Sequence, residues 1–381
     1  MKNLFPFYTE DISQFKWEEI LKNYSWASDM IGVPQDAIFH AEGDVSTHTR
    51  MVIESLLRLP EFRLQNEENK FALFMGCVLH DVEKRSTTFE EDGRIVSPGH
   101  AKKGERTARQ ILYRDIQVPF LLRETIAKIV RHHGLPLWMM EKPNPTKSII
   151  EASLVCNTQL LEIIAKADVL GRICPDSDEL LYRIDLFKEL AIESDCYGNK
   201  RKFSSDLGRF KYFNTENAYT DYEPFDDRKF DVFVMCGIPG SGKDYYIKNS
   251  LSNYPAVSLD ALRFEHKIKP DDKSGTGTII QLAKERAKEY MRKKQSFVWN
   301  GTNLTRQIRQ QVIDMCEDYG GRVKIVYVEV PYRKVLHQNQ NREYPIPINV
   351  LERFIDKLEM PSPSEAHSVE YFVNGENLVN L

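Results

Sequence analysis

The sequence predicts a two-domain protein, with an all-α domain in its first half and an α/β domain with a parallel sheet in its second half. Residues 1–199 place apolar side chains at helical spacing and show no sustained β alternation, whereas residues 230–381 alternate strand-like with helix-like stretches. A length of 381 residues exceeds one ordinary domain and fits two. We interpret residues 200–229, which are rich in charged and aromatic side chains but lack periodicity, as a linker.

The helices expected in the first half are separated by Pro and Gly residues, which interrupt regular structure. Apolar spacing predicts these helices at Phe15–Tyr24, Thr47–Leu59, Lys70–Val82, Ala101–Tyr113, Pro119–His132, Lys147–Val169 and Glu179–Glu193. In the second half, apolar runs predict strands at Val232–Cys236, Ala256–Leu259, Ser296–Trp299, Val323–Val330 and Tyr371–Val373. Helices are expected between them, chiefly at Ile279–Lys294, Thr305–Tyr319 and Pro347–Leu358. This alternation predicts a parallel sheet with helices on both faces.

Composition narrows the class of protein. Apolar residues make up 41% and charged residues 28% of the chain, which are ordinary values for globular domains. The six cysteines form no C-x-x-C pair, which favours reduced thiols in the cytoplasm and argues against a cysteine zinc site. The N-terminus lacks the apolar core of a signal peptide, and no apolar run approaches about 18 residues. We therefore expect a soluble cytoplasmic protein with no membrane partner.

The charge balance leaves nucleic-acid binding open. A net charge of −4 does not indicate such binding, yet a local basic groove is compatible with that sum. In the linker, Lys200, Arg201 and Lys202 precede a series of aromatic residues. Interleaved basic and aromatic side chains can steer and stack a single nucleic-acid strand. The alternative is that these aromatics anchor the linker on one or both domains.

A phosphate-binding loop follows the first strand of the second half. The pattern G-x-x-x-x-G-K is formed by Gly237, Ile238, Pro239, Gly240, Ser241, Gly242 and Lys243. Such a loop turns backbone N–H groups and a helix N-terminus onto a polyphosphate, and its lysine reaches the outer phosphates. Asp244 stands where a Ser or Thr hydroxyl would hold Mg²⁺, and a carboxylate is also a suitable Mg²⁺ ligand. The sequence therefore predicts a site for ATP or another NTP with Mg²⁺.

Polar residues after the next two strands predict phosphoryl transfer to a hydroxyl. Asp260 lies at the expected carboxyl end of the second strand, where a carboxylate can take the proton of an acceptor hydroxyl. Arg263 follows three residues later and can bind an acceptor phosphate. Alternatively, Asp260 caps a helix and Arg263 is a surface residue. Residues that can orient acceptor or nucleotide follow the third strand, although helix capping explains one of them equally well: Asn300, Thr302 and Asn303.

Histidines and aspartates gather at the ends or polar breaks of the apolar helices in the first half. They are His48, His80, Asp81, His100, His132, His133 and Asp168. Burying so many ionisable groups without a metal would be costly. Imidazoles with carboxylates suit transition metals, and oxygen-rich sets suit Mg²⁺ or Mn²⁺. The alternative is a helical bundle with incidental histidines.

The order of these residues resembles the HD superfamily of phosphohydrolases, whose pattern H…HD…D needs only His48, His80, Asp81 and Asp168. The additional histidines resemble the branch of that superfamily that holds a two-metal centre. The resemblance implies that Asp81 bridges one or two divalent transition metals. In that pattern His48, His80 and Asp168 complete one site, and His100 with either His132 or His133 completes the other. Lys84, one turn after His80, either neutralises a phosphate oxygen or is a solvated surface lysine.

The second half resembles the phage and bacterial 5′-OH polynucleotide kinases. The resemblance is carried by the loop G-x-P-G-S-G-K, by Asp260 and Arg263 as D-x-x-R, and by the stretch Asn339–Arg342 followed by Ile346–Leu351. In those kinases a lid of similar form brings an arginine over the transferring phosphate, which implies that role for Arg342. The sequence departs from the pattern at Gln338, where the family has a further arginine.

The whole chain resembles the bacterial family that fuses an HD phosphoesterase to a polynucleotide kinase. That resemblance implies 5′ phosphorylation with ATP, GTP or another NTP and Mg²⁺, together with removal of 3′- or 2′-phosphate and opening of 2′,3′-cyclic phosphate. It implies single-stranded RNA or DNA ends as substrates and a nucleic-acid ligase as functional partner. Two alternatives remain, a nucleoside or nucleotide kinase joined to a nucleotidase, and a regulatory module gated by NTP.

Overall fold

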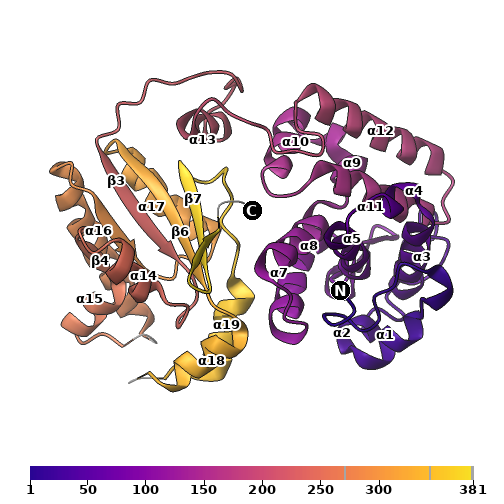
Figure 1. Ribbon diagram of the computed structural model, residues 1–381, viewed down its shortest axis with the longest axis horizontal. Helices are drawn as coiled ribbons and strands as arrows, with labels where there is room; N and C mark the ends of the chain where they lie inside the picture. Colours follow the sequence, from indigo (N-terminus) through magenta and orange to yellow (C-terminus); the bar gives the residue numbers. More distant parts are fainter. Residues whose placement is uncertain (270–271, 343–344, 379–381) are drawn as a thin grey trace. The chain divides into compact units, whose positions relative to one another are not determined.

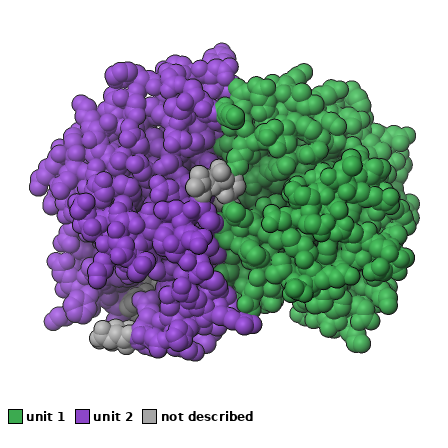
Figure 2. Space-filling view, viewed as in Figure 1, with its two compact units in different colours: residues 1–202, 381 green, residues 203–380 purple. Residues whose placement is uncertain are grey.

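The computed structural model describes residues 1–269, 272–342 and 345–378. Its chain divides into two compact units, Met1–Lys202 and the residues from Phe203 onward (Figures 1 and 2). The first unit is helical apart from one short hairpin, and the second is built around a mostly parallel sheet. The predicted fold class is therefore confirmed.

The elements of the first unit are mostly short helices. In chain order they are η1 (Ile12–Gln14), α1 (Trp17–Asn23), α2 (Ser25–Ser28), α3 (Val45–Arg58), α4 (Pro60–Arg63), α5 (Glu67–Leu79), α6 (Lys84–Thr87), β1 (Phe89–Glu91), β2 (Arg94–Val96), α7 (His100–Gln110), η2 (Ile111–Asp115), α8 (Phe120–His132), α9 (Leu135–Trp138), η3 (Met139–Glu141), α10 (Pro145–Ser153), α11 (Thr158–Leu170) and α12 (Ser177–Glu193).

Helix α5 forms the centre of this unit. Asn66 caps its N-terminus by accepting a hydrogen bond from the Asn69 N–H, and every residue from Phe71 to Leu79 is buried. A helix that is apolar on all sides has to be surrounded, and α5 packs against α3, α8 and α11. His80 and Asp81, which directly follow α5, are consequently placed in the interior between these helices.

Two features of the first unit differ from the prediction. Strands β1 and β2 form an antiparallel hairpin around Asp92 and Gly93, both of which have positive φ. Three-residue strands carry no periodic signal, although the Asp-Gly turn is itself a hairpin signature. A single helix was predicted at Lys147–Val169, but the structure has two helices there, α10 and α11. Asn157 caps the N-terminus of α11, where its side-chain oxygen accepts a hydrogen bond from the Gln159 N–H.

Among the described residues, no single helix is long and apolar enough to cross a membrane. Helices α10 and α11 meet that test only when taken together, and they are bent by 109° at their junction.

The second unit begins with part of the segment predicted to be a linker. Helix α13 (Asp206–Asn214) lies in this segment. Arg209 donates hydrogen bonds to the carbonyls of Pro363 and His367, and the Phe210 ring stacks on the His367 ring at a centroid distance of 4.3 Å. Arg228 pairs with Glu317. These basic and aromatic side chains anchor the segment on the second unit.

The rest of the second unit alternates strands and helices. In chain order its elements are β3 (Phe230–Cys236), α14 (Lys243–Ser250), β4 (Ala256–Ser258), α15 (Leu259–Glu265), α16 (Lys273–Arg292), β5 (Phe297–Asn300), α17 (Arg306–Glu317), β6 (Gly321–Glu329), α18 (Tyr332–Gln340), α19 (Ile348–Lys357), β7 (Ser368–Val373) and β8 (Glu376–Leu378). The sheet order is β4-β5-β3-β6-β7-β8, with every pair parallel except β7 and β8.

Strand β3 lies inside the sheet, hydrogen-bonded to β5 on one edge and to β6 on the other. Its side chains alternate between the faces. Phe233 and Met235 join a buried cluster with Tyr246 and Leu251 from the region of α14. Helix α17 packs against β3 and β6. The carboxyl ends of β3, β4 and β5 therefore share one edge, which in open α/β sheets is where ligands bind.

Gly171, directly after α11, provides a test of the packing between α11 and α3. A Cβ atom at residue 171 would lie 2.7 Å from the Val52 Cα atom, a backbone position that cannot rotate away. We expect Gly171→Ala to destabilise the first unit by about 1–3 kcal/mol, measured by calorimetric unfolding. Gly277→Ala, where nothing lies within 4 Å, is the control and should be neutral or slightly stabilising. Equal stability of both variants would contradict this packing.

Candidate functional site

The interior of the first unit gathers two groups of candidate metal ligands. One group is His48, His80 and Asp168, and the other is Asp81, His100 and His133; within each group the ligand atoms lie within 4.8 Å of one another. They come from α3, α7, α11 and the residues directly after α5 and α8. All but His100 are buried. Side chains from distant parts of the sequence thus converge on one centre.

Asp81 lies between the two groups and turns one carboxylate oxygen toward each. Its Oδ2 atom is 3.3 Å from His80 Nε2 and 3.8 Å from His48 Nε2. Its Oδ1 atom is 3.4 Å from His100 Nε2 and 3.9 Å from His133 Nε2, and it is buried without a hydrogen-bond partner. This arrangement suits a carboxylate that bridges two cations.

Backbone carbonyls orient three of the imidazoles. His80, His100 and His133 each direct Nδ1 at the carbonyl three residues earlier, at distances of 2.7 to 2.8 Å. An Nδ1–H donated to a carbonyl leaves a lone pair on Nε2, as metal-bound histidines require. His100 Nε2 and His133 Nε2 then face each other at 3.5 Å as two acceptors. A cation between them satisfies both, so these residues fit a metal.

Glu42 performs the same task for His48 and was not predicted from the sequence. Its Oε1 atom lies 2.8 Å from His48 Nδ1 and 2.9 Å from His40 Nδ1. A carboxylate behind a ligating imidazole fixes its tautomer and raises its basicity. The only sequence signal was spacing, since Glu42 stands six residues before His48 in the segment ahead of α3.

Two cationic side chains, Lys84 and Arg172, neutralise the buried carboxylates of Asp81 and Asp168. Burial alone would raise the pKa of Asp81, but the Lys84 ammonium, 2.8 Å from Oδ2, helps to hold that pKa well below its ordinary value. Burial is likewise outweighed at Asp168, where Arg172 and His48 hold the pKa of the carboxyl well below its ordinary value. Arg172 Nε donates to Asp168 Oδ1 at 3.0 Å. Lys84 is thus bound at the centre rather than solvated.

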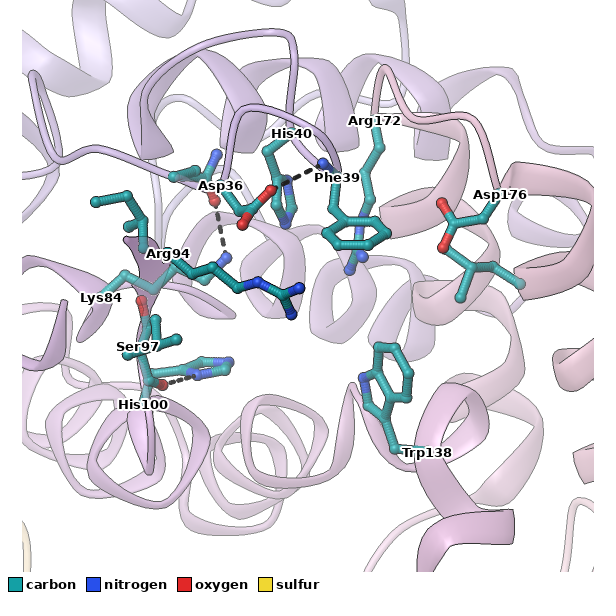
Figure 3. A pocket seen from close by; sticks show the side chains of 14 residues that line it. Asp36, Phe39, His40, Lys84, Arg94, Ser97, His100, Trp138, Arg172 and Asp176 are labelled. Atoms are coloured by element: carbon teal, nitrogen blue, oxygen red, sulfur yellow. Dashed lines mark hydrogen bonds between the residues drawn. The ribbon is translucent and has the colours of Figure 1, made fainter. Parts of the chain in front are cut away.

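The centre adjoins a cavity of about 350 Å³ (Figure 3). Lys84, Arg94 and Arg172 bring positive charge to the lining of this cavity, which also includes the imidazoles of His40 and His100. Apolar and aromatic residues line other parts of it, including Phe39, Ile95, Trp138 and Leu180. The cavity therefore offers positive charge and an apolar wall to one ligand.

The prediction left open whether His132 or His133 is a ligand. His133 belongs to the group with Asp81 and His100, whereas His132 belongs to neither group. Burial and the charges of Arg131 and Lys128 lower the pKa of His132 to about 3. His132 is therefore a neutral imidazole that does not join the centre.

The predicted phosphate-binding loop connects β3 to α14 in the second unit. Gly237, Gly240 and Gly242 have φ values of 151°, 80° and 99°, which favour glycine. A Cβ atom at Gly237 would lie 2.5 Å from the Val328 carbonyl oxygen. Lys243 Nζ donates to the carbonyls of Gly237 and Ile238, both at 3.0 Å. The lysine thus lies within the curve of the loop.

Asp244 and Asn300 meet beside this loop. Asn300, at the end of β5, donates its amide to Asp244 Oδ1 at 2.9 Å. Asp244 is exposed, and its charge opposes the lowering of the Lys243 pKa, which places the carboxylate close to the ammonium. An exposed carboxylate next to a phosphate-binding lysine fits a Mg²⁺ ligand.

Asp260 lies in the first turn of α15, two residues after β4 ends. Ser258 caps this helix by accepting the Ala261 N–H, so the alternative in which Asp260 is the cap is wrong. The Asp260 side chain is 91% exposed, and its charge also acts on Lys243. Arg263 Nη1 lies 4.0 Å from Asp260, while its Nε is buried without a hydrogen-bond partner.

Asn303 is buried and is not available to orient acceptor or nucleotide, contrary to the prediction. It is 3% exposed, has a φ of 45°, and donates its amide to the Met235 carbonyl at 2.7 Å. Its own carbonyl accepts a hydrogen bond from Arg309. The Thr302 carbonyl accepts the Gly237 N–H at 3.0 Å. Both residues therefore support the loop from beneath, and Thr305 caps the following helix.

Arg342 follows α18 and is exposed, and its charge contributes to lowering the pKa of Lys243. Asn339 fixes this segment by donating its amide to the Ile346 carbonyl at 2.8 Å and accepting the Ile346 N–H at 3.0 Å. Sequence reasoning had given Asn339 no role of its own. The two hydrogen bonds join Asn339, three residues before Arg342, to Ile346.

Two family models match the chain, one within each of its two compact units. Residues 45–173 match a family model described as the HD domain, and residues 232–361 match one described as an AAA domain. The first match contains every residue of the two ligand groups, and the second contains the phosphate-binding loop. The chain joins an HD domain to a P-loop domain.

Individual proteins resemble the chain over shorter stretches. A "Multifunctional CCA protein" from Halorhodospira halophila is 33% identical over 104 residues, which are 27% of this chain and 22% of that protein. Among solved structures, a putative kinase from Chloroflexus aurantiacus is 13% identical, with a TM-score of 0.32 over 39% of this chain and 87% of that one. A gluconokinase from Sinorhizobium meliloti is 17% identical, with a TM-score of 0.29 over 39% of this chain and 85% of that one.

Nucleotide binding by the P-loop domain should weaken at alkaline pH. Burial lowers the pKa of Lys243 to about 8, so the nucleotide-free protein loses this ammonium above pH 8. An unshifted lysine would keep its charge to about pH 10. We expect the affinity for ATP, measured by isothermal titration calorimetry, to fall up to about tenfold per pH unit above 8. Lys243→Arg, which stays protonated, should show a flat profile; a flat wild-type profile would contradict the shift.

Proposed function

We propose that this chain heals nucleic-acid ends, adding phosphate to a 5′-OH at the P-loop domain and removing 3′-phosphate, 2′-phosphate or 2′,3′-cyclic phosphate at the HD domain. The observation that supports this proposal is that one chain joins an HD domain with a His/Asp cluster to a P-loop domain with a phosphate-binding loop. The cluster is the Asp81 centre with its basic cavity. The loop is the one around Lys243, with Asp260 and Arg342 close enough to act on its charge.

At the HD domain, the protein's own groups position and neutralise a phosphate. His48, His80, Asp168, Asp81, His100 and His133 would hold divalent cations, which would supply Lewis acidity and lower the pKa of a bound water that attacks phosphorus. Asp81 keeps both oxygens charged because Lys84 lies against it. Glu42 and the backbone carbonyls keep the Nε2 atoms turned inward. Lys84, which also donates to Gln35 Oε1 at 2.8 Å, is placed to meet a phosphate oxygen in the cavity.

At the P-loop domain, Asp260 takes the proton of the attacking hydroxyl and Lys243 binds the outer phosphates of the NTP. Asp260 is exposed at the edge of the sheet, so an acceptor on a long chain can reach it. Arg342 stabilises the charge that develops on the transferring phosphoryl group. Arg263, whose Nε has no hydrogen-bond partner among the described residues, binds the phosphate next to the acceptor hydroxyl.

Polynucleotide ends are the substrate class that uses both reactions. Breaks that leave 5′-OH with 3′-phosphate or cyclic phosphate need phosphate added at one end and removed at the other before ligation. The D-x-x-R pair and the segment from Asn339 to Arg342 support this class, because they resemble polynucleotide kinases in particular. Either RNA or DNA satisfies this chemistry, and a ligase would use the product.

The two activities should be separable by single substitutions. We expect Asp260→Ala to lower 5′ phosphorylation by roughly 10²–10⁴-fold, the usual contribution of a general base, and to leave phosphate removal unchanged. Asp81→Ala should do the reverse. The assay follows both ends of a 5′-OH, 3′-phosphate oligonucleotide incubated with ATP, Mg²⁺ and a panel of divalent transition metals. Loss of both activities from one substitution would refute two independent sites, and phosphorylation of nucleosides in preference to oligonucleotides would refute the substrate class.

A further inference from the structure

Arg94 differs from the other cationic side chains that line the cavity of the HD domain. It is exposed on β2, in the hairpin that follows α6, and its guanidinium extends toward the middle of the cavity (Figure 3). No ion pair or hydrogen bond joins its side chain to another described residue. A guanidinium without a partner that faces a cavity is available to an anionic ligand.

The other cations of the cavity are already engaged at the metal centre. Lys84 is paired with Asp81, and Arg172 is paired with Asp168. Among the acidic residues that line the cavity, Asp36 accepts backbone N–H groups of Ile38 and Phe39 and forms no ion pair with Arg94. A phosphate at the metal centre would therefore contact Lys84 and the metal ions. Arg94 would then be left to bind a different phosphate.

The hairpin holds Arg94 at a fixed position. Asp92 and Gly93 form its two-residue turn, with φ values of 51° and 74°, as such a tight turn requires. At the base of the hairpin, the Thr88 and Ser97 hydroxyls are hydrogen-bonded at 2.7 Å. The Ser97 carbonyl also accepts a hydrogen bond from His100 Nδ1. One short segment thus carries both a ligand of the metal centre and the unpaired guanidinium.

Aromatic rings complete this part of the cavity. Phe39 is 43% and Trp138 40% exposed, and both rings lie beyond the end of the Arg94 side chain (Figure 3). The Arg183 guanidinium lies 5.1 Å from the Trp138 ring centre and supports the indole. Partly exposed aromatic rings beside a cation suit a nucleobase attached to a phosphate.

We propose that Arg94, with Phe39 and Trp138, forms a subsite for the nucleotide that carries the scissile phosphate, in which Arg94 binds the second phosphate of that nucleotide and the rings contact its base. This inference rests on the proposed function of the HD domain and specifies how its substrate is recognised. The subsite makes the centre select a nucleotide with phosphates on both sides of the sugar, as at a polynucleotide end, over a single phosphomonoester.

Tryptophan fluorescence tests this subsite without turnover. Trp138 is partly exposed, whereas Trp17, Trp26 and Trp299 are buried, so a ligand in the cavity should change the Trp138 signal. The full-length protein is titrated in EDTA with adenosine 3′,5′-bisphosphate and with adenosine 3′-monophosphate. We expect the bisphosphate to bind about tenfold more tightly, as one charge-assisted contact provides, and Trp138→Phe to remove the signal.

Substitution of Arg94 decides the assignment. Arg94→Gln should bind both ligands equally, while Arg58→Gln, which alters an exposed arginine outside the cavity, should keep the preference. A preference that survives Arg94→Gln, equal affinities in the wild type, or no binding of either ligand would overturn the subsite. If the preference depends on Arg94 but the metal-loaded enzyme releases no phosphate from either compound, the subsite stands and the proposed hydrolytic function fails.

Discussion

The HD domain depends on keeping the Asp81 carboxylate charged although its side chain is buried. Burial favours the neutral acid, and the Lys84 ammonium opposes that preference. The fold meets this constraint by leading the fully buried α5 directly into His80 and Asp81. Three imidazoles donate Nδ1–H to their own backbone, so every Nε2 faces the carboxylate as an acceptor. Such a convergence of acceptors suits divalent cations.

The P-loop domain solves the opposite problem, because its ligand is the anion. The loop needs glycines where a Cβ atom would meet the neighbouring strand, as at Gly237. Asn303 and the buried Arg309 support the loop from below, and Arg309 is itself neutralised by Glu365 at 2.7 Å. Lys243 is consequently held inside the loop, where burial lowers its pKa. The negative charge of a bound polyphosphate would favour its protonated form. The groups expected to act on the acceptor, Asp260 and Arg263, remain at the accessible sheet edge.

Sequence reasoning reached the fold class and most of the site because both depend on local patterns. Apolar periodicity marks helices, and a glycine-rich turn between a strand and a helix marks a phosphate loop. It could not choose between His132 and His133, since neighbouring residues at a helix end differ only in the direction their side chains take. It missed Glu42, whose contact with His48 depends on the path of the chain ahead of α3. It also missed Arg172, which stands four residues after Asp168 at the end of one helix, a spacing at which side chains can pair. It misplaced Asn303, because a buried amide and a ligand-facing amide look identical in sequence.

The central claim is that Asp81 joins two cation sites, one on each of its carboxylate oxygens. Anomalous diffraction from crystals of the full-length protein soaked in Mn²⁺ tests it most directly. The account predicts two peaks on either side of Asp81, one beside His48, His80 and Asp168 and the other beside His100 and His133. A single peak that leaves either oxygen of Asp81 without a metal, or a peak beside His132, would contradict it.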